Sequence, residues 1–356
     1  MALPPVVRIL ERLSRQPTAP LHEHAVLTEA TRIANGFDAR VRRDEFGNLI
    51  VRPRGTRKGP AVWLVAHTDH PGFEVVGRRE AVFLGGVAPA YFRRGTPLRF
   101  YHGGAVIPAT IGGKERRGVR WRVRLQGDQA GVLRKGDFGV WELPDFEVRS
   151  GHVRARQLDD LAGSAVSLTA VARACADRRL NLVALLTRAE EIGFVGSLGA
   201  ASRGRIPRDD WIINVEASRA IPGVEIGGGP VIRVGDRQRT FDAGAENLLH
   251  VGRAKLGTER PVQRWLMSGG TCEATAWGLF GYRATGVAIP LGNYHNQGPG
   301  NRVAPEVVSV QDLRTAVDLI ELAARNVPAA LRRDDATRER ILRYLRRYGG
   351  RLQRTR

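Results

Sequence analysis

Cysteine is scarce in this 356-residue sequence, which contains only Cys175 and Cys272. Two isolated cysteines exclude a disulfide framework and a CxxC metal pair, and they indicate a reducing compartment. Long hydrophobic runs are also missing, because no stretch approaches the ~20 apolar residues that a membrane helix needs. The N-terminal segment MALPPVVRILERLSRQ is interrupted by Pro, Arg and Glu, so it lacks the apolar core of a signal peptide. The sequence therefore predicts a cytoplasmic protein with no membrane partner.

Acidic residues are few relative to basic ones, 36 against 56, which gives a net charge of +20. The apolar fraction of 42% and the charged fraction of 26% are those of a folded globular protein. The excess is almost all arginine and is spread along the chain. Its densest run is residues 331–356, with ten arginines against three acids. A nucleic-acid role for this tail stays open, but a solvated or subunit-contacting helix is the favoured interpretation.

The order of the expected elements predicts an α/β protein with an insertion. Helices are expected over 4–16 and 21–36, strands over 39–43 and 48–53, and a strand buried on both faces at AVWLVAH. Short β-like runs separated by glycine-rich turns follow, and the α/β pattern resumes at residue 159 and ends with an amphipathic helix over 305–327. We expect a three-layer core with a mixed sheet between helices, of the phosphorylase/hydrolase-like type, and a small β-barrel inserted into it. The division into domains is 1–71 with 154–328 for the catalytic domain, 72–153 for the barrel and 329–356 for a basic C-terminal extension.

Polar side chains occur repeatedly where apolar runs stop. In VWLVAHTDHPGF, His67 and Asp69 point the same way because side chains alternate along a strand. The same juxtaposition of an apolar run with acids or histidine recurs in QLDDLAG, LLTRAEEIGFVGS, WIINVEAS and GVAIPLGNYHNQG. Ligands of open α/β sheets bind at the carboxyl ends of the strands, so we expect these groups to share one edge.

A two-metal hydrolytic site fits this set of groups. Zinc accepts imidazole nitrogen and carboxylate oxygen, and two metals ~3.5–4 Å apart can share a bridging carboxylate and water. The proposed ligands are two histidines and three acids, namely His67, Asp159, Glu191, Glu216 and His295. Asp69 would orient His67, and Glu190 would move the proton between water and the leaving amine. Two divalent ions per subunit are expected, with zinc favoured and cobalt or manganese as alternatives.

In this order, the motifs resemble the dinuclear metallo-aminopeptidase family of glutamyl aminopeptidases and tetrahedral aminopeptidases, endoglucanase-like members included. The resemblance covers roughly residues 20–325 and rests on DEFGNLI, AHTDHPGF, LDDLAG, TRAEEIGFVGS, NVEAS and IPLGNYHN. It implies that His67 and Glu216 hold one metal, that Glu191 and His295 hold the other, and that Asp159 bridges them. It also implies that Glu190 is the general base, that Asp69 is the orienting acid, and that the protein forms a homo-oligomer, often a dodecamer.

Several positions depart from the family pattern. Glu216 stands where the family usually has Asp, Leu161 stands where an arginine usually follows the Asp-Asp pair, and His70 replaces an acid after His-x-Asp. The expected activity is release of N-terminal residues from peptides. A metal-dependent carboxypeptidase or an N-acyl-amino-acid deacylase is the nearer alternative, because related enzymes differ at the position of Glu216. A non-catalytic protein that binds nucleic acid through its tail is the remote one.

Overall fold

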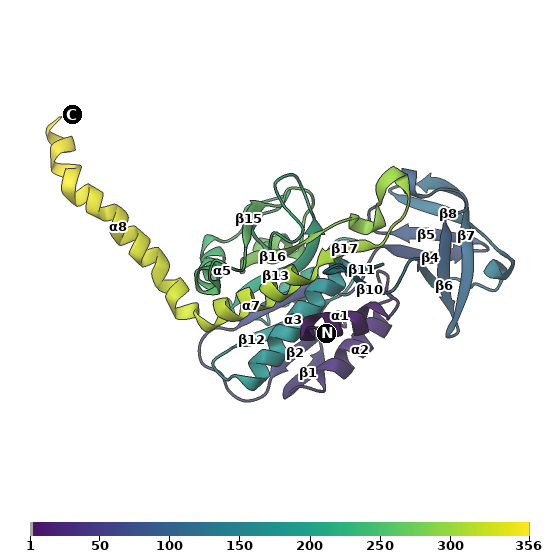
Figure 1. The fold of residues 1–356 in the computed structure, drawn as a ribbon, viewed down its shortest axis with the longest axis horizontal. Coiled ribbons are helices and arrows are strands. Elements are labelled where there is room, and N and C mark those ends of the chain that lie inside the picture. The colour runs from purple at the N-terminus through teal and green to yellow at the C-terminus, as the bar shows by residue number, and fades with distance from the viewer. Residues whose placement is uncertain (1–2, 356) are drawn as a thin grey trace.

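The computed structural model describes residues 3–355, apart from the side chain of Asp334, so the outermost residues of the predicted terminal ranges lie outside it. Across these residues a mixed sheet of eight strands forms the centre of the molecule (Figure 1). From one edge to the other the strands are β1 (Ala39–Arg43), β2 (Leu49–Pro53), β12 (Leu182–Thr187), β3 (Val62–His67), β13 (Trp211–Arg219), β16 (Arg283–Leu291), β14 (Val231–Gly235) and β15 (Gln263–Leu266). The central strands β12, β3, β13 and β16 are parallel, so their carboxyl ends meet at one edge.

Helices cover both faces of this sheet, which explains why its central strands are apolar on both sides. One face packs against α1 (Pro5–Ser14), α2 (His24–Ala34), α3 (Leu158–Ala176), α5 (Ala243–Leu256) and α7 (Val310–Arg325). The other packs against α4 (Val195–Ser202) and α6 (Glu273–Leu279). In β3, Leu64 belongs to the first core and Trp63 to the second, as strand alternation requires. The predicted three-layer α/β core is confirmed.

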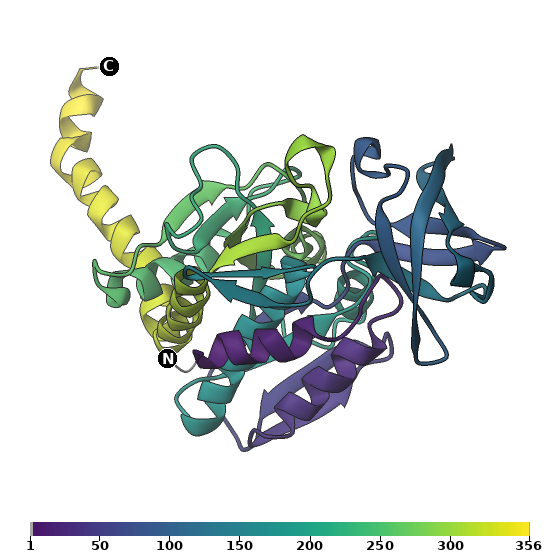
Figure 2. The same cartoon turned by 45° about the vertical axis from the view of Figure 1, so that its right-hand side comes forward.

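A closed antiparallel barrel forms a second lobe, seen on the right in Figure 2. Around the barrel run β4 (Gly72–Gly77), β5 (Glu80–Leu84), β8 (Arg120–Gln126), β7 (Ala105–Arg117), β6 (Pro97–His102) and β9 (Phe138–Trp141). Aromatic rings fill its interior, with Phe73 and Trp141 in edge contact at 4.9 Å between ring centroids. The predicted small barrel is therefore confirmed, and all of its strands fall within the range 72–153.

One element differs from those expected from the sequence. The expected helix over 305–327 is split, because β17 (Glu306–Ser309) pairs with β11 (His152–Ala155), which also pairs with β10 (Glu147–Arg149). Helix α7 begins only after Ser309, whose hydroxyl accepts from the backbone N–H of Gln311 at 3.1 Å. The chain then turns into a long helix, α8 (Val327–Arg354), which projects from the body (Figure 1). None of the helices in residues 3–355 has both the length and the apolarity needed to cross a membrane.

Candidate metal centre

The carboxyl edge of the parallel strands collects the predicted side chains. His67 is the last residue of β3, Glu190 and Glu191 follow β12, and His295 follows β16 in a short 3-10 turn, Tyr294–Asn296. These three strands lie within the parallel block β12-β3-β13-β16 of the sheet. The sequence argument that strand ends bring polar groups together is therefore correct for these four residues.

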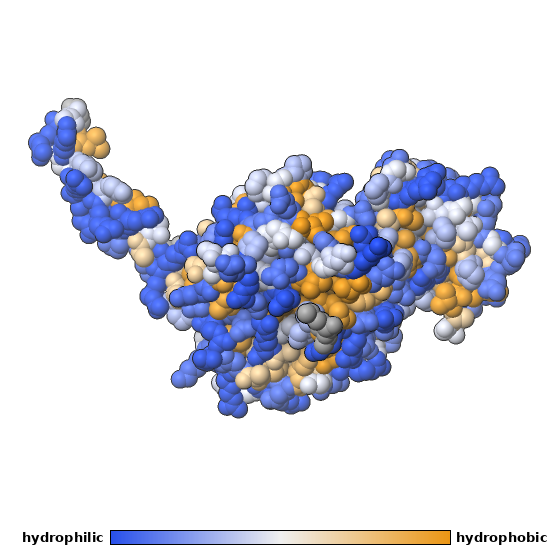
Figure 3. Space-filling view, in the orientation of Figure 1, coloured by the Kyte–Doolittle hydropathy of each residue, from blue (hydrophilic) through white to orange (hydrophobic). Residues whose placement is uncertain are grey.

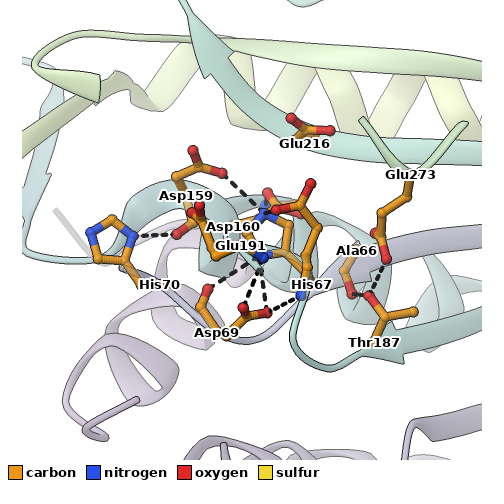
Figure 4. A network of polar contacts seen from close by, with 12 residues as sticks. Ala66, His67, Asp69, His70, Asp159, Asp160, Thr187, Glu191, Glu216 and Glu273 are labelled. Carbon is orange, nitrogen blue, oxygen red and sulfur yellow. Dashed lines mark hydrogen bonds and ion pairs between the residues drawn. The ribbon is translucent and has the colours of Figure 1, made fainter. Parts of the chain in front are cut away.

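Asp159 reaches the same edge from the opposite direction. It lies in the first turn of α3, where its backbone is not helical (φ −87°, ψ 104°). Its Oδ1 lies 3.2 Å from His67 Nε2 (Figure 4). Its Oδ2 lies 3.5 Å from His295 Nε2. One carboxylate thus faces both imidazoles with a different oxygen.

Two groups of potential ligands result within the described residues. One contains His67, Glu190 and Glu191, and the other contains Asp159, Glu191 and His295. In each group the ligand atoms lie within 4.8 Å of one another, and Glu191 is common to both. Such compact sets of imidazole nitrogens and carboxylate oxygens match the ligand chemistry of zinc and similar divalent ions.

The outer nitrogens of the two imidazoles establish their tautomers. His67 Nδ1 donates to the backbone carbonyl of Asp69 at 3.1 Å, and His295 Nδ1 donates to that of Gly86 in the barrel lobe. A carbonyl oxygen can only accept, so each Nδ1 carries a hydrogen, and in the neutral form of each imidazole Nε2 presents a lone pair to the site. This is the arrangement in which histidine binds a metal.

The buried carboxylate oxygens of the site favour a bound cation. Within residues 3–355, the buried Oδ1 of Asp159 and Oε1 of Glu191 have no hydrogen-bond partner, although each lies close to an imidazole Nε2. A lone pair facing an ionised oxygen is favourable only when a proton or a metal ion lies between them. The residues present therefore fit a divalent metal.

The pKa values of the site residues also indicate that the site favours positive charge. Burial alone lowers the pKa of His67, but Glu190, Asp159 and Asp69 raise it well above its ordinary value. Burial likewise opposes charge on His295, whose pKa is nevertheless raised well above normal by Glu191 and Asp159. Burial favours the neutral form of Asp159, yet the two histidines lower its pKa below its usual range. Positive charge is thus stabilised between these groups.

The comparisons with known proteins identify the family. The chain matches the model of the M42 glutamyl aminopeptidases over residues 124–319, which is 196 of its 356 residues. The chain belongs to the M42 glutamyl aminopeptidase family. It is accordingly a peptide hydrolase of the aminopeptidase type, and membership implies divalent metal ions. The family prediction made from the motifs is confirmed.

Solved structures share this fold. A TET aminopeptidase from a marine sediment archaeon of the Thaumarchaeota has 18% identity and a TM-score of 0.76, over 91% of this chain and 99% of that one. The TET1 peptidase of Pyrococcus horikoshii has 20% identity and a TM-score of 0.74, over 90% and 99%. An endoglucanase from Thermotoga maritima has 19% identity and a TM-score of 0.65, over 90% and 99%. No curated protein sequence matches the chain.

In this M42 peptidase, Asp69 supports the site from behind. It is fully buried, and Oδ1 lies 3.5 Å from His67 Nδ1. Its two oxygens accept from the backbone N–H groups of Glu190 and Glu191, each at 3.0 Å. One side chain therefore fixes the loop that carries two site glutamates and also lies beside His67.

Glu216 has a different environment from the other predicted ligands. It lies inside β13, which continues to Arg219 because it stays paired with β16, so the expectation that it follows the strand end is wrong. Its Oε2 is 3.4 Å from the buried Arg233 Nη1, and it is in neither of the two ligand groups. Burial raises the pKa of Glu216 to about 7 against the opposing charge of Arg233.

Three buried residues around the site were not identified from the sequence. Glu306 accepts from the backbone N–H groups of Leu158, Asp159 and His295 at 2.7, 3.0 and 2.8 Å. Glu273 accepts from the hydroxyls of Thr187 and Ser197, and Arg233 pairs with Glu216. The available signal for Glu306 was an acid at the start of the apolar run EVVS, which resembles many solvated strand ends.

His70, which stands where the family pattern has an acid, has a supporting position in the structure. Its side chain is 1% exposed, and Nδ1 bonds to the backbone carbonyl of Asp159 at 2.6 Å. Burial, together with the nearby His295, lowers the pKa of His70 to about 4. The residue therefore packs behind Asp159 and does not face the ligand groups.

Proposed function

We propose that this M42 aminopeptidase is a dinuclear metal hydrolase that releases the N-terminal residue of peptides. The observation that carries the proposal is Asp159, whose two oxygens face the Nε2 atoms of His67 and His295. Asp159 would bridge two metals, with His67 on one and His295 with Glu191 on the other. Glu216 would join His67 after exchanging its contact with Arg233 for the metal.

The chemistry that bound divalent ions supply here is Lewis-acid activation of water and of the scissile carbonyl. The chain itself moves the proton. Glu190 Oε2 lies 3.9 Å from His67 Nε2, so the carboxylate borders the reacting position. In the metal-free protein, burial, reinforced by Glu191 and Glu216, raises the pKa of Glu190 well above its ordinary value, and its place beside His67 suits a general base. It would take the proton of the attacking water and deliver it to the leaving amine.

The test is a paired substrate panel on metal-stripped and reloaded protein. Free aminoacyl anilides are compared with their N-acetylated counterparts and with peptides blocked at the C-terminus, and zinc, cobalt and manganese are added separately. The proposal predicts metal-dependent cleavage of substrates with a free amine. Turnover confined to acylated substrates or free C-termini would instead indicate a deacylase or carboxypeptidase.

Glu190→Gln separates the role of base from that of ligand. We expect kcat to fall by about 10²–10⁴-fold, while two metal ions per chain still bind. A loss of metal stoichiometry in this variant would make Glu190 a ligand and contradict its assignment as the base.

We also propose that the protein self-associates. The P. horikoshii TET1 peptidase can assemble into a tetrahedron or a large octahedral shell, and this chain shares its fold. A dodecamer is the specific form expected, and sedimentation measurements test it. A cytoplasmic location stays a prediction, and a nucleic-acid role of the tail stays the disfavoured alternative.

A further inference from the structure

Helix α8 carries an apolar stripe that its own chain leaves uncovered. The helix packs against α5 near its start and then extends away from the body (Figures 1 and 2). In its outer half, Ile341, Leu345, Tyr348 and Leu352 are 58%, 64%, 48% and 72% exposed. Figure 3 shows apolar groups on this projecting arm next to the hydrophilic ones. Contiguous exposed apolar side chains mark an interaction surface.

The spacing of the stripe indicates what covers it. Successive members are four, three and four residues apart, which is the alternation of a two-helix coiled-coil seam. A seam of this kind is narrower than the apolar face with which a helix packs on a globular core. The stripe is therefore shaped for one partner helix.

Most arginines in the outer half of α8 lie on the side of the helix away from the stripe. On a 3.6-residue helix the positions beside the stripe are Leu342, Tyr344, Gly349 and Arg351. The opposite side carries Arg340, Arg343, Arg346, Arg347 and Arg354. Two copies that pack stripe to stripe consequently keep these guanidinium groups on the outside of the pair, where solvent and salt screen their repulsion.

We propose that α8 pairs with α8 of a second copy of this chain. The stripe is self-complementary, as a twofold interface between identical subunits requires. Helix α8 begins after residue 319, where the match to the M42 family model ends, so the contact is an addition to the catalytic domain. It does not depend on the proposed two-metal chemistry.

Site-directed cross-linking tests the contact directly. In a Cys175→Ser background, Leu345→Cys and Tyr348→Cys are oxidised separately and as a mixture, and Arg347→Cys on the opposite face is the matched control. A parallel pair gives covalent dimers of the separate variants, and an antiparallel pair gives them in the mixture. Either pattern, at least tenfold above the control, supports the proposal. Covalent dimer no higher than the control in every arm overturns it.

Charge-matched variants separate helix pairing from binding to polyanions. Leu345→Glu with Leu352→Glu and Arg343→Gln with Arg347→Gln both lower the net charge by two, on opposite faces. Sedimentation equilibrium should show at least tenfold weaker association for the first variant alone, with unchanged hydrolysis of an aminoacyl anilide in both. Unchanged association of the first variant overturns the proposal. So does a monomeric wild type that binds phosphatidylserine vesicles or duplex DNA through the arginines.

Discussion

Replacing Asp69 with asparagine removes one acceptor atom from the back of the candidate metal centre. In the wild type each carboxylate oxygen accepts one buried backbone N–H, from Glu190 and from Glu191, at 3.0 Å. An amide offers one oxygen and one NH₂ group. Whichever way the new side chain turns, one of the two glutamate N–H groups meets a donor and loses its partner.

The chain contains a matched control for this change. Asp312, at the start of α7, is also fully buried, and its two oxygens accept from the N–H groups of Gly227 and Gly229 at 2.7 and 2.9 Å. An unpaired buried N–H costs about 1–3 kcal/mol. We therefore expect Asp69→Asn and Asp312→Asn to lower the free energy of unfolding of the metal-free protein by similar amounts, about 2 kcal/mol each.

The two variants should diverge in function. Only Asp69 holds the loop of Glu190 and Glu191 and lies beside His67. Loss of such a supporting contact typically costs about 10–100-fold in metal affinity or activity. Urea unfolding of the stripped proteins, metal titration by calorimetry and kcat/KM on an aminoacyl anilide measure the three quantities. Equal losses of activity in both variants, or none in Asp69→Asn, would refute the positioning role of Asp69.

Three further outcomes follow from the contacts. Glu306→Gln should weaken metal binding about 10–100-fold, because its carboxylate holds the backbones of Asp159 and His295; unchanged titration curves would count against this. Gly163→Ala should destabilise the fold by about 1–3 kcal/mol, because the added Cβ would lie 2.2 Å from Val215 O. At Gly270 an added Cβ would meet no atom within 4 Å, so Gly270→Ala should leave the thermal melting temperature unchanged. The raised pKa values of both site histidines and of the glutamates mean that the folded, metal-free protein binds more protons than the unfolded chain. The free energy of unfolding of the metal-free protein should therefore fall as pH rises from about 5 to 8. Saturating zinc should reverse this pH dependence, because the metal replaces the protons. A pH dependence that zinc leaves unchanged would contradict the metal site.

Some site residues could be placed from the sequence alone, because their positions follow from the hydrophobic pattern of their own segments. Strand β3 is recognisable as an apolar run, and a parallel strand buried on both faces must end at the ligand-binding edge, so the place of His67 follows from its own segment. The same holds for Glu190 and Glu191 after β12. The barrel is equally visible, because alternating short strands with glycine turns fit no helix.

Contacts between segments distant in sequence could not be derived in this way. Glu306 is joined to Leu158 across 148 residues and to His295 across 11, and nothing in its neighbours distinguishes it from an acid at a solvated strand end. The ion pair of Glu216 with Arg233 also depends on the pairing of β14 with β16, and β14 was not expected. A buried carboxylate is therefore recognised by the hydrogen-bond donors around it, and only the fold shows which donors those are.

The barrel illustrates why such contacts matter for chemistry. Gly86, between β5 and β6 of the barrel, supplies the carbonyl that fixes the hydrogen of His295 on Nδ1. Nearby, the N–H of Ala88 donates to Gln297 Oε1 at 3.1 Å, and the hydroxyl of Tyr91 donates to the carbonyl of Gly298 at 2.9 Å. The segment after β16 is thus held by the barrel lobe as well as by the sheet. Without the Gly86 carbonyl, a neutral His295 could place its hydrogen on Nε2 and lose the lone pair that faces Asp159 and Glu191. The barrel lobe therefore helps to position the candidate metal centre, although it contributes no residue to either ligand group.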